Sequence, residues 1–361
     1  MTGNTGEEDR VAADEWAAAI RAGDFDRAWA ISDRNLNSHR GECGDKHDGP
    51  RHQQRIWRGE MLSGQRVLVR CYHGLGDTIQ FIRFAKPLRQ LAREVIVWCQ
   101  PELLSLVGRV EGVDRAIALH DGTPEVDFDT DIEIMELPHA IKATRDQVEM
   151  REPYLRLGPC GAAPRDRGLA VGVAWEVGDW DKRRSIPPAE LRRIRLPGVR
   201  LFSLQRGDGA AAVDEIGAID ISTPDIEALG HRLRTMDIVV CPDTMIAHLS
   251  AALGCETWVM LHSDCDWRWP KTGSTALWYP SVRLFRQAKP GDWRGVVDEV
   301  QRAIEDMMSA APWRFTEAFA REPSAPPWRA ATTEHVLRRS SRADADNPDR
   351  NAPVGSGLPN P

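Results

Sequence analysis

No apolar run in this sequence of 361 residues approaches the roughly 20 residues that a membrane-spanning helix needs. The stretch 1–9 is polar and acidic, which is not the pattern of a secretory signal. From these two absences we expect a cytoplasmic protein without a transmembrane segment, and a peripheral association with a membrane stays open. An apolar content of 42% with 28% charged residues is typical of a globular protein, and the length allows two domains of ordinary size.

Cysteine usage and net charge count against three further classes of protein. The seven cysteines are scattered, odd in number and without a C-x-x-C spacing, so neither a disulfide framework nor a zinc knuckle is indicated. We expect free, buried thiols in a reducing compartment. A net charge of -7 argues against a general nucleic-acid binder. The cysteines are Cys43, Cys71, Cys99, Cys160, Cys241, Cys255 and Cys265.

The two ends of the chain differ in pattern from its middle. Residues 1–37 predict two short amphipathic helices joined by a turn at Gly23 and Asp24, and 22–28 resemble part of one tetratricopeptide unit. Because a single unit cannot bury its own apolar face, we expect it to pack on the rest of the protein or on a partner. Residues 38–55 are polar and turn-rich and predict a linker, and 312–361 predict a disordered tail.

The middle of the chain alternates short β-branched runs with helical patterns. This alternation predicts an α/β fold with parallel sheets. A first domain is predicted at 56–160 and a second at 165–308, separated by a stretch rich in glycine, proline and charge. Pro87 should end or kink the helix that follows the first strand, and Thr223 with Pro224 should begin a later helix. The predicted strands are 66–72, 95–98, 116–119, 132–135, 169–175, 199–204, 237–240 and 256–261.

The stretch 241–248 predicts a strand end, a tight turn and the start of a helix. The free N–H groups and the dipole of a helix N-terminus favour an anion such as a nucleotide diphosphate, provided that the site lies at the carboxyl edge of a parallel sheet. On these residues alone, a plain N-cap is the favoured interpretation of Asp243.

A second strand-to-helix turn carries two glycines and an aspartate, in His73-Gly-Leu-Gly-Asp77. Without a third glycine, this is weak evidence for a dinucleotide site. Asp77 reads either as a helix cap or as a carboxylate placed to take a proton from an attacking hydroxyl. The residues alone leave both interpretations open.

Six motifs, in this order and at these distances, resemble glycosyltransferase family 9, the heptosyltransferase-like family, and its branch associated with tetratricopeptide repeats. The resemblance covers roughly residues 55–305. It implies a GT-B fold, with two Rossmann-like domains facing a cleft, an acceptor domain first and a donor domain second. It also implies an inverting, metal-independent transfer of a sugar. The motifs are 74–81, 184–187, 203–205, 243–248, 252–254 and 266–269.

The resemblance also implies roles for individual residues. Asp77 matches the general base that acts on the acceptor hydroxyl, and His73, Gly74 and Gly76 belong to its cleft loop. Arg184 falls where the family has a basic residue, more often lysine, on the donor phosphates, and Lys182 is near enough to share that role. The other expected donor-binding residues are Ser203, Gln205, Asp243, Thr244, Met245 and His248.

Three positions depart from the family pattern. Met245 stands where heptosyltransferases carry glycine, His73 where glutamine is usual and Glu176 where glycine is usual. Three hypotheses follow: transfer of a sugar, with heptose among the candidates, to a saccharide; transfer to a protein such as flagellin; and a catalytically silent binding module.

The expected co-substrate is a nucleotide-sugar, with an ADP-sugar favoured, and we expect no cofactor and no metal. Asp264 and Asp266 have the D-x-D spacing of a metal site, but Asp266 is better explained as part of the Asp-Trp-Arg-Trp motif at 266–269.

Overall fold

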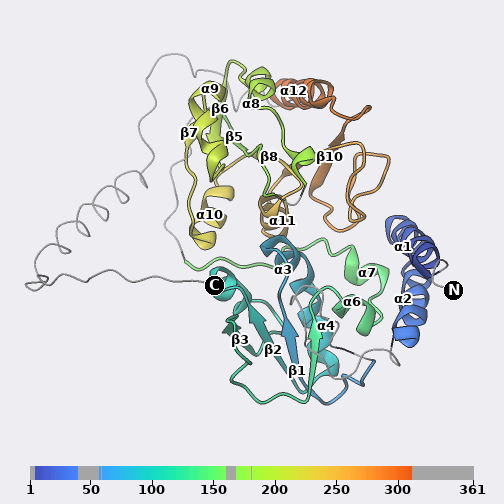
Figure 1. Cartoon of the computed structure of the whole chain (residues 1–361). Coiled ribbons are helices and arrows are strands. Elements are labelled where there is room, and N and C mark those ends of the chain that lie inside the picture. The colour runs from blue at the N-terminus through green and yellow to red at the C-terminus, as the bar shows by residue number, and fades with distance from the viewer. Residues whose placement is uncertain (1–4, 40–56, 58, 160–167, 180, 311–361) are drawn as a thin grey trace, which may run out of the picture. The chain divides into compact units, whose positions relative to one another are not determined.

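The computed structural model describes residues 5–39, 57, 59–159, 168–179 and 181–310, and these belong to one compact unit (Figure 1). The predicted linker beyond residue 39 and the predicted tail at 312–361 lie outside the described residues. The proposed domain limits of 56–160 and 165–308 stay predictions.

The predicted N-terminal helix pair is present as α1 (Thr5–Ala22) and α2 (Phe25–His39). Gly23, in the turn between them, has a φ of +71°, a conformation that glycine adopts without strain. The pair packs on the rest of the unit, as expected from its apolar face. Arg21 donates to the carbonyl of Trp269 at 3.3 Å, and the Trp29 indole donates to the carbonyl of Ala143 at 2.8 Å.

The first sheet has four parallel strands in the order β3-β2-β1-β4. The apolar runs of its two central strands, β1 and β2, are buried, as is usual in parallel sheets covered by helices. The strands are β1 (Arg66–Arg70), β2 (Glu94–Cys99), β3 (Arg115–Ala118) and β4 (Thr130–Glu133). The helices of this part are α3 (Leu75–Phe81), α4 (Ala85–Leu91), α5 (Leu104–Val107), α6 (Leu137–Ala140) and α7 (Arg145–Val148), with 3-10 turns at Ile82–Phe84 and Pro101–Leu103.

The predicted break near Pro87 is present, but it lies earlier in the chain. The helix α3 ends at Phe81, a 3-10 turn follows, and Pro87 lies in the first turn of α4. Proline is tolerated there because the first N–H groups of a helix have no intrahelical partner.

The second sheet has six parallel strands in the order β10-β9-β8-β5-β6-β7. They are β5 (Leu169–Val173), β6 (Val199–Ser203), β7 (Ile219–Asp220), β8 (Ile238–Pro242), β9 (Thr257–Leu261) and β10 (Val282–Arg286). The helices are α8 (Pro188–Leu191), α9 (Val213–Ile216), α10 (Ile226–Leu233), α11 (Met245–Ala252) and α12 (Trp293–Ala310), with 3-10 turns at Lys182–Arg184, Arg192–Ile194 and Asp208–Ala212.

The start of α10 corrects one prediction. Asp225, and not Thr223, is its N-cap, and the Asp225 carboxylate accepts from the Ala228 N–H at 3.0 Å. A carboxylate at this position also interacts favourably with the helix dipole, so the cap lies one residue beyond the predicted Thr223-Pro224 pair.

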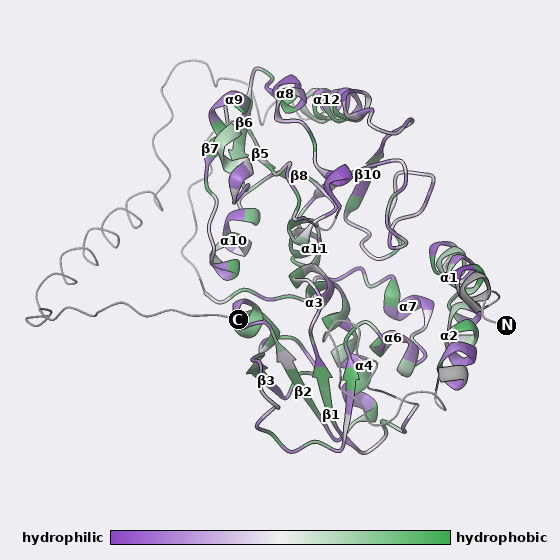
Figure 2. Cartoon of the chain, in the orientation of Figure 1, coloured by the Kyte–Doolittle hydropathy of each residue, from purple (hydrophilic) through white to green (hydrophobic). Residues whose placement is uncertain are grey.

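The fold class predicted from the sequence, α/β with parallel sheets, is confirmed. Figure 2 shows apolar residues along the strands, and both hydrophobic (green) and hydrophilic (purple) residues on α12. Val296, Val297 and Val300 of α12 are buried against the second sheet. Such one-sided burial is the pattern of an amphipathic surface helix. Within the described residues, no helix combines the length and the apolar character needed to cross a bilayer.

Candidate functional site

The two strand-to-helix turns singled out in the sequence meet in the structure. The helix α3 follows β1, α11 follows β8, and the two helices pack against each other (Figure 1). A Cβ atom at Gly76 would lie 3.0 Å from Cδ2 of His248 and 3.5 Å from Cα of Met245. Glycine at 76 therefore allows the close approach of α11 to the turn that carries Asp77.

Asp77 is both a cap and a member of a charged cluster. Its Oδ2 accepts from the N–H of Gly74, the N-cap of α3, at 3.0 Å. Its Oδ1 lies 2.5 Å from Nη2 of Arg268. A carboxylate has about four acceptor positions, so these two contacts leave room for an incoming hydroxyl. The cap and the base interpretations are thus compatible.

Arg268 is a residue of this site that sequence reasoning missed. Its side chain is only 10% exposed and donates to Asp266 at 2.9 Å and to Gln80 at 2.7 Å. Burial alone would lower the pKa of this guanidinium, but the carboxylates of Asp266 and Asp77 raise it above its ordinary value. The motif at 266–269 was recognised, and its central arginine was the available signal.

Asp243 is not the N-cap that one interpretation proposed, since Thr244 occupies that position. Its carboxylate lies 3.7 Å from Nε2 of His248. Burial would raise the pKa of Asp243, but His248 and the Arg268 charge outweigh it and lower the pKa below the ordinary value. His248 is fixed in turn, because its Nδ1 lies 3.0 Å from the Tyr279 hydroxyl and its ring stacks on Trp269.

The N-terminus of α11 carries an unsatisfied polar group. Oγ1 of Thr244 is buried and has no hydrogen-bond partner among the described residues, and Thr244 makes no side-chain cap. Met245 follows as the first residue of the helix. The first N–H groups of a helix lack intrahelical acceptors, so this end of α11 presents donors suited to an anion.

Arg184 lies beside this helix end. Its Nη1 donates to the carbonyl of Asp243 at 2.9 Å and lies 3.7 Å from the Asp243 carboxylate. Lys182 is more exposed and faces two acidic side chains, Asp179 at 3.1 Å and Glu176 at 3.4 Å. The structure thus places Arg184, and not Lys182, against the turn that begins α11.

Ser203 and Gln205 are placed behind the site. Ser203 has no exposed surface, and its hydroxyl accepts from the N–H of Gln205 at 3.3 Å. The Gln205 amide oxygen accepts from the N–H groups of Trp175 and Glu176 at 3.0 and 2.9 Å. Gln205 thus shapes the loop after β5, and Ser203 supports Gln205. The expected donor contacts of both residues stay predictions.

A second residue missed from the sequence is Glu133, at the end of β4. Its Oε1 lies 3.4 Å from Nε2 of His73, and its Oε2 accepts from the Met135 N–H at 2.8 Å. Burial, with the nearby charges of Glu136 and Asp77, raises the pKa of Glu133 to about 8. An acidic residue inside the predicted strand 132–135 was the only sequence signal.

No family model matches the chain. A curated relative, Protein FlbA of Caulobacter vibrioides, is 23% identical over 293 residues, which make up 70% of this chain and 48% of that protein. The chain therefore spans about half the length of this relative.

Solved structures that are similar to this chain include proteins of the family that the motifs resemble. The glycosyl transferase family 9 protein of Veillonella parvula has 12% identity and a TM-score of 0.49, covering 70% of this chain and 99% of its own. E. coli heptosyltransferase WaaC with ADP-2-deoxy-2-fluoro heptose has 14% identity and a TM-score of 0.47, covering 67% and 99%. E. coli ADP-heptose lps heptosyltransferase II has 11% identity and a TM-score of 0.48, covering 67% of this chain and 99% of its own. The tetratricopeptide branch stays a prediction.

Proposed function

We propose that this protein is an inverting, metal-independent glycosyltransferase that moves a sugar from a nucleoside-diphosphate donor to an acceptor hydroxyl. The observation that carries the proposal is the packing of α3 on α11, which brings a carboxylate, Asp77, next to a helix N-terminus suited to a diphosphate. The resemblance of the six sequence motifs to glycosyltransferase family 9 supports the same reaction.

The donor diphosphate would bind at the start of α11. The buried hydroxyl of Thr244 and the first N–H groups of the helix supply hydrogen-bond donors, and the Arg184 guanidinium supplies positive charge beside them. Charge that develops on the leaving diphosphate is then stabilised by fixed donors. An ADP-sugar is the favoured donor, with heptose among the candidate sugars.

The acceptor hydroxyl would be activated by Asp77. As the acceptor oxygen bonds to the anomeric carbon, its proton passes to the Asp77 carboxylate, and the nucleoside diphosphate leaves with the electrons of the broken C–O bond. Arg268 holds this carboxylate in place through its Nη2 contact. A single displacement of this kind inverts the anomeric centre.

The second candidate is a catalytically silent binding module. It is favoured by one observation, namely that each oxygen of Asp77 already accepts one hydrogen bond, from Gly74 or from Arg268, so an incoming hydroxyl would have to share its acceptor. A protein acceptor in place of a saccharide stays an alternative within the transferase proposal.

The test is calorimetric titration of ADP, UDP, GDP and CMP into the purified full chain. Selective binding of ADP supports the favoured donor, and a preference for another nucleotide keeps the transferase but replaces the donor. Absence of binding to all four contradicts the proposal of a nucleotide-sugar site.

A further inference from the structure

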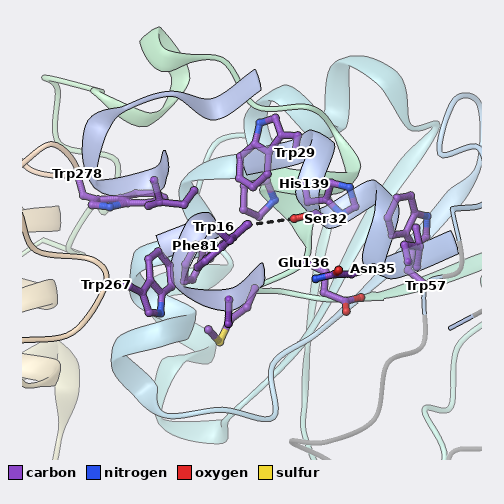
Figure 3. Close-up of a pocket in the computed structure, with 15 residues that line it drawn as sticks. Trp16, Trp29, Ser32, Asn35, Trp57, Phe81, Glu136, His139, Trp267 and Trp278 are labelled. Carbon is purple, nitrogen blue, oxygen red and sulfur yellow. Dashed lines mark hydrogen bonds between the residues drawn. The ribbon is translucent and has the colours of Figure 1, made fainter. Parts of the chain in front are cut away.

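A pocket of about 280 Å³ lies between the N-terminal helix pair and the rest of the described chain. It is walled by α1 and α2, by the segment that follows β4, and by loops that carry Trp267 and Trp278 (Figure 3). It shares no lining residue with the proposed diphosphate site at Thr244 and Arg184.

The walls of this pocket present mainly the carbon surfaces of aromatic rings. Trp16 donates its indole N–H to Ser32 at 3.1 Å, Trp29 donates to the Ala143 carbonyl at 2.8 Å, and Trp57 donates to the Glu60 carbonyl at 2.9 Å. Because these N–H groups are already satisfied, the three indoles offer a ligand ring faces and edges more than hydrogen bonds.

The size and the polar groups of the pocket restrict the ligand. At roughly 30 Å³ per water the volume holds about nine waters, and cavities of about half this size bind benzene. Two polar side chains at the wall are already engaged: Nε2 of His139 lies 2.9 Å from the Asp33 carboxylate, and Ser32 accepts from Trp16. Buried hydroxyls without partners are costly, so a sugar fits poorly.

A cation is disfavoured at Trp267 and Phe81, because one already lies over these two wall residues. The Arg268 guanidinium carbon is 4.5 Å from the Trp267 ring centroid and 5.7 Å from that of Phe81. A ring that already faces one cation attracts a second less strongly. We propose that this pocket binds a neutral aromatic group of one or two rings.

One lining residue, Ala13 on α1, is exposed to solvent. A ligand can therefore enter the pocket beside Ala13. The aromatic group could come from a free small molecule or from a side chain of a larger partner. N-acetyl-tryptophanamide distinguishes these sources, since it carries the indole on a piece of backbone. If the natural ligand is a side chain of a partner, N-acetyl-tryptophanamide should bind as tightly as indole. If it is a free small molecule, N-acetyl-tryptophanamide should bind at least tenfold more weakly than indole.

The experiment is calorimetric titration of indole into the full chain and into two variants. Ala13→Phe places a ring at the pocket, and Ala18→Phe places the same ring at another exposed position of α1 that does not line it. We expect saturable binding of one indole, weakened at least tenfold by Ala13→Phe and changed less than twofold by Ala18→Phe, with equal melting temperatures of the two variants.

Two results would overturn the inference: no saturable binding of indole, or tighter binding of tetramethylammonium or methyl glucoside than of indole. Neither depends on nucleotide binding, so failure of this proposal is separable from failure of the proposed transferase function.

Discussion

The carboxylate of Asp77 and the guanidinium of Arg268 lie 2.5 Å apart, although 191 residues separate them in the chain. The contact joins the first turn of α3 to the loop after β9 and places a buried cation beside the proposed base. Arg268 also holds Asp266 and Gln80, so one side chain organises three polar groups of the site.

Replacing Arg268 by methionine should destabilise the protein. The change keeps an apolar stem but leaves the Asp77 and Asp266 carboxylates, which are 26% and 34% exposed, without their cation. Loss of hydrogen bonds to charged groups of this kind costs about 1.5–3 kcal/mol. Denaturant unfolding measures the loss. Arg151→Met at an exposed position is the control and should change stability by less than about 0.5 kcal/mol. Equal unfolding midpoints for the two variants would show that the contacts of Arg268 do not stabilise the fold.

Substitution of Gly76 by alanine should also be costly. The added Cβ would meet Cδ2 of His248 at 3.0 Å, and overpacking of this kind costs about 1–3 kcal/mol. The matched control is Gly178→Ala, where a Cβ meets nothing within 4 Å. Thermal unfolding of both variants checks the prediction. A melting temperature for Gly76→Ala as high as that for Gly178→Ala would mean that α3 and α11 can move apart freely.

Nucleotide binding should depend on Arg184 more than on Arg183. Hydrogen bonds to charged groups contribute about 1.5–3 kcal/mol, so Arg184→Ala should weaken binding of ADP at least tenfold. Arg183 is 65% exposed and paired with Asp181, and Arg183→Ala should change the affinity less than threefold. Calorimetric titration of ADP into the two variants measures the change in affinity. A larger loss of ADP affinity in Arg183→Ala than in Arg184→Ala would contradict the assignment of Arg184 to the diphosphate site.

Glu133 should make stability fall as pH rises. Burial raises its pKa in the folded protein to about 8, against 4.5 for the ordinary side chain. A raised pKa stabilises the fold most at low pH, and this contribution is lost as pH rises from about 4.5 through about 8. Glu133→Gln keeps the shape but does not titrate, so it should gain stability relative to wild type between pH 5 and pH 9. A pH-independent difference in melting temperature would contradict this account.

The elements predicted correctly are those that a local sequence pattern defines. The β-branched runs at β1, β2, β8 and β9 and the glycine and aspartate turns that follow β1 and β8 all appeared near the expected positions. The strands β7 and β10 were missed, because β7 has two residues and β10 alternates apolar residues with Arg283 and ends at Arg286. Short or arginine-interrupted strands give little pattern to detect.

The candidate site was predictable in part for the same reason. Asp77, Asp243 and Thr244 lie at turns that the local sequence defines. Arg268 and Glu133 depend on contacts between distant segments and on burial, which no local pattern records. The burial of Ser203 likewise follows from how β6 packs and not from its motif.

The most direct test of the central claim is release of nucleoside diphosphate from a panel of ADP-, UDP- and GDP-sugars by wild type and by Asp77→Asn. Asparagine can still accept from the Gly74 N–H, so the start of α3 is preserved while the negative charge is lost. General-base catalysis contributes about 10²–10⁴-fold, and we predict at least a hundredfold slower release by the variant with the preferred donor. Equal rates for the two proteins, with the donor bound by both, would contradict the assignment of Asp77 as the base.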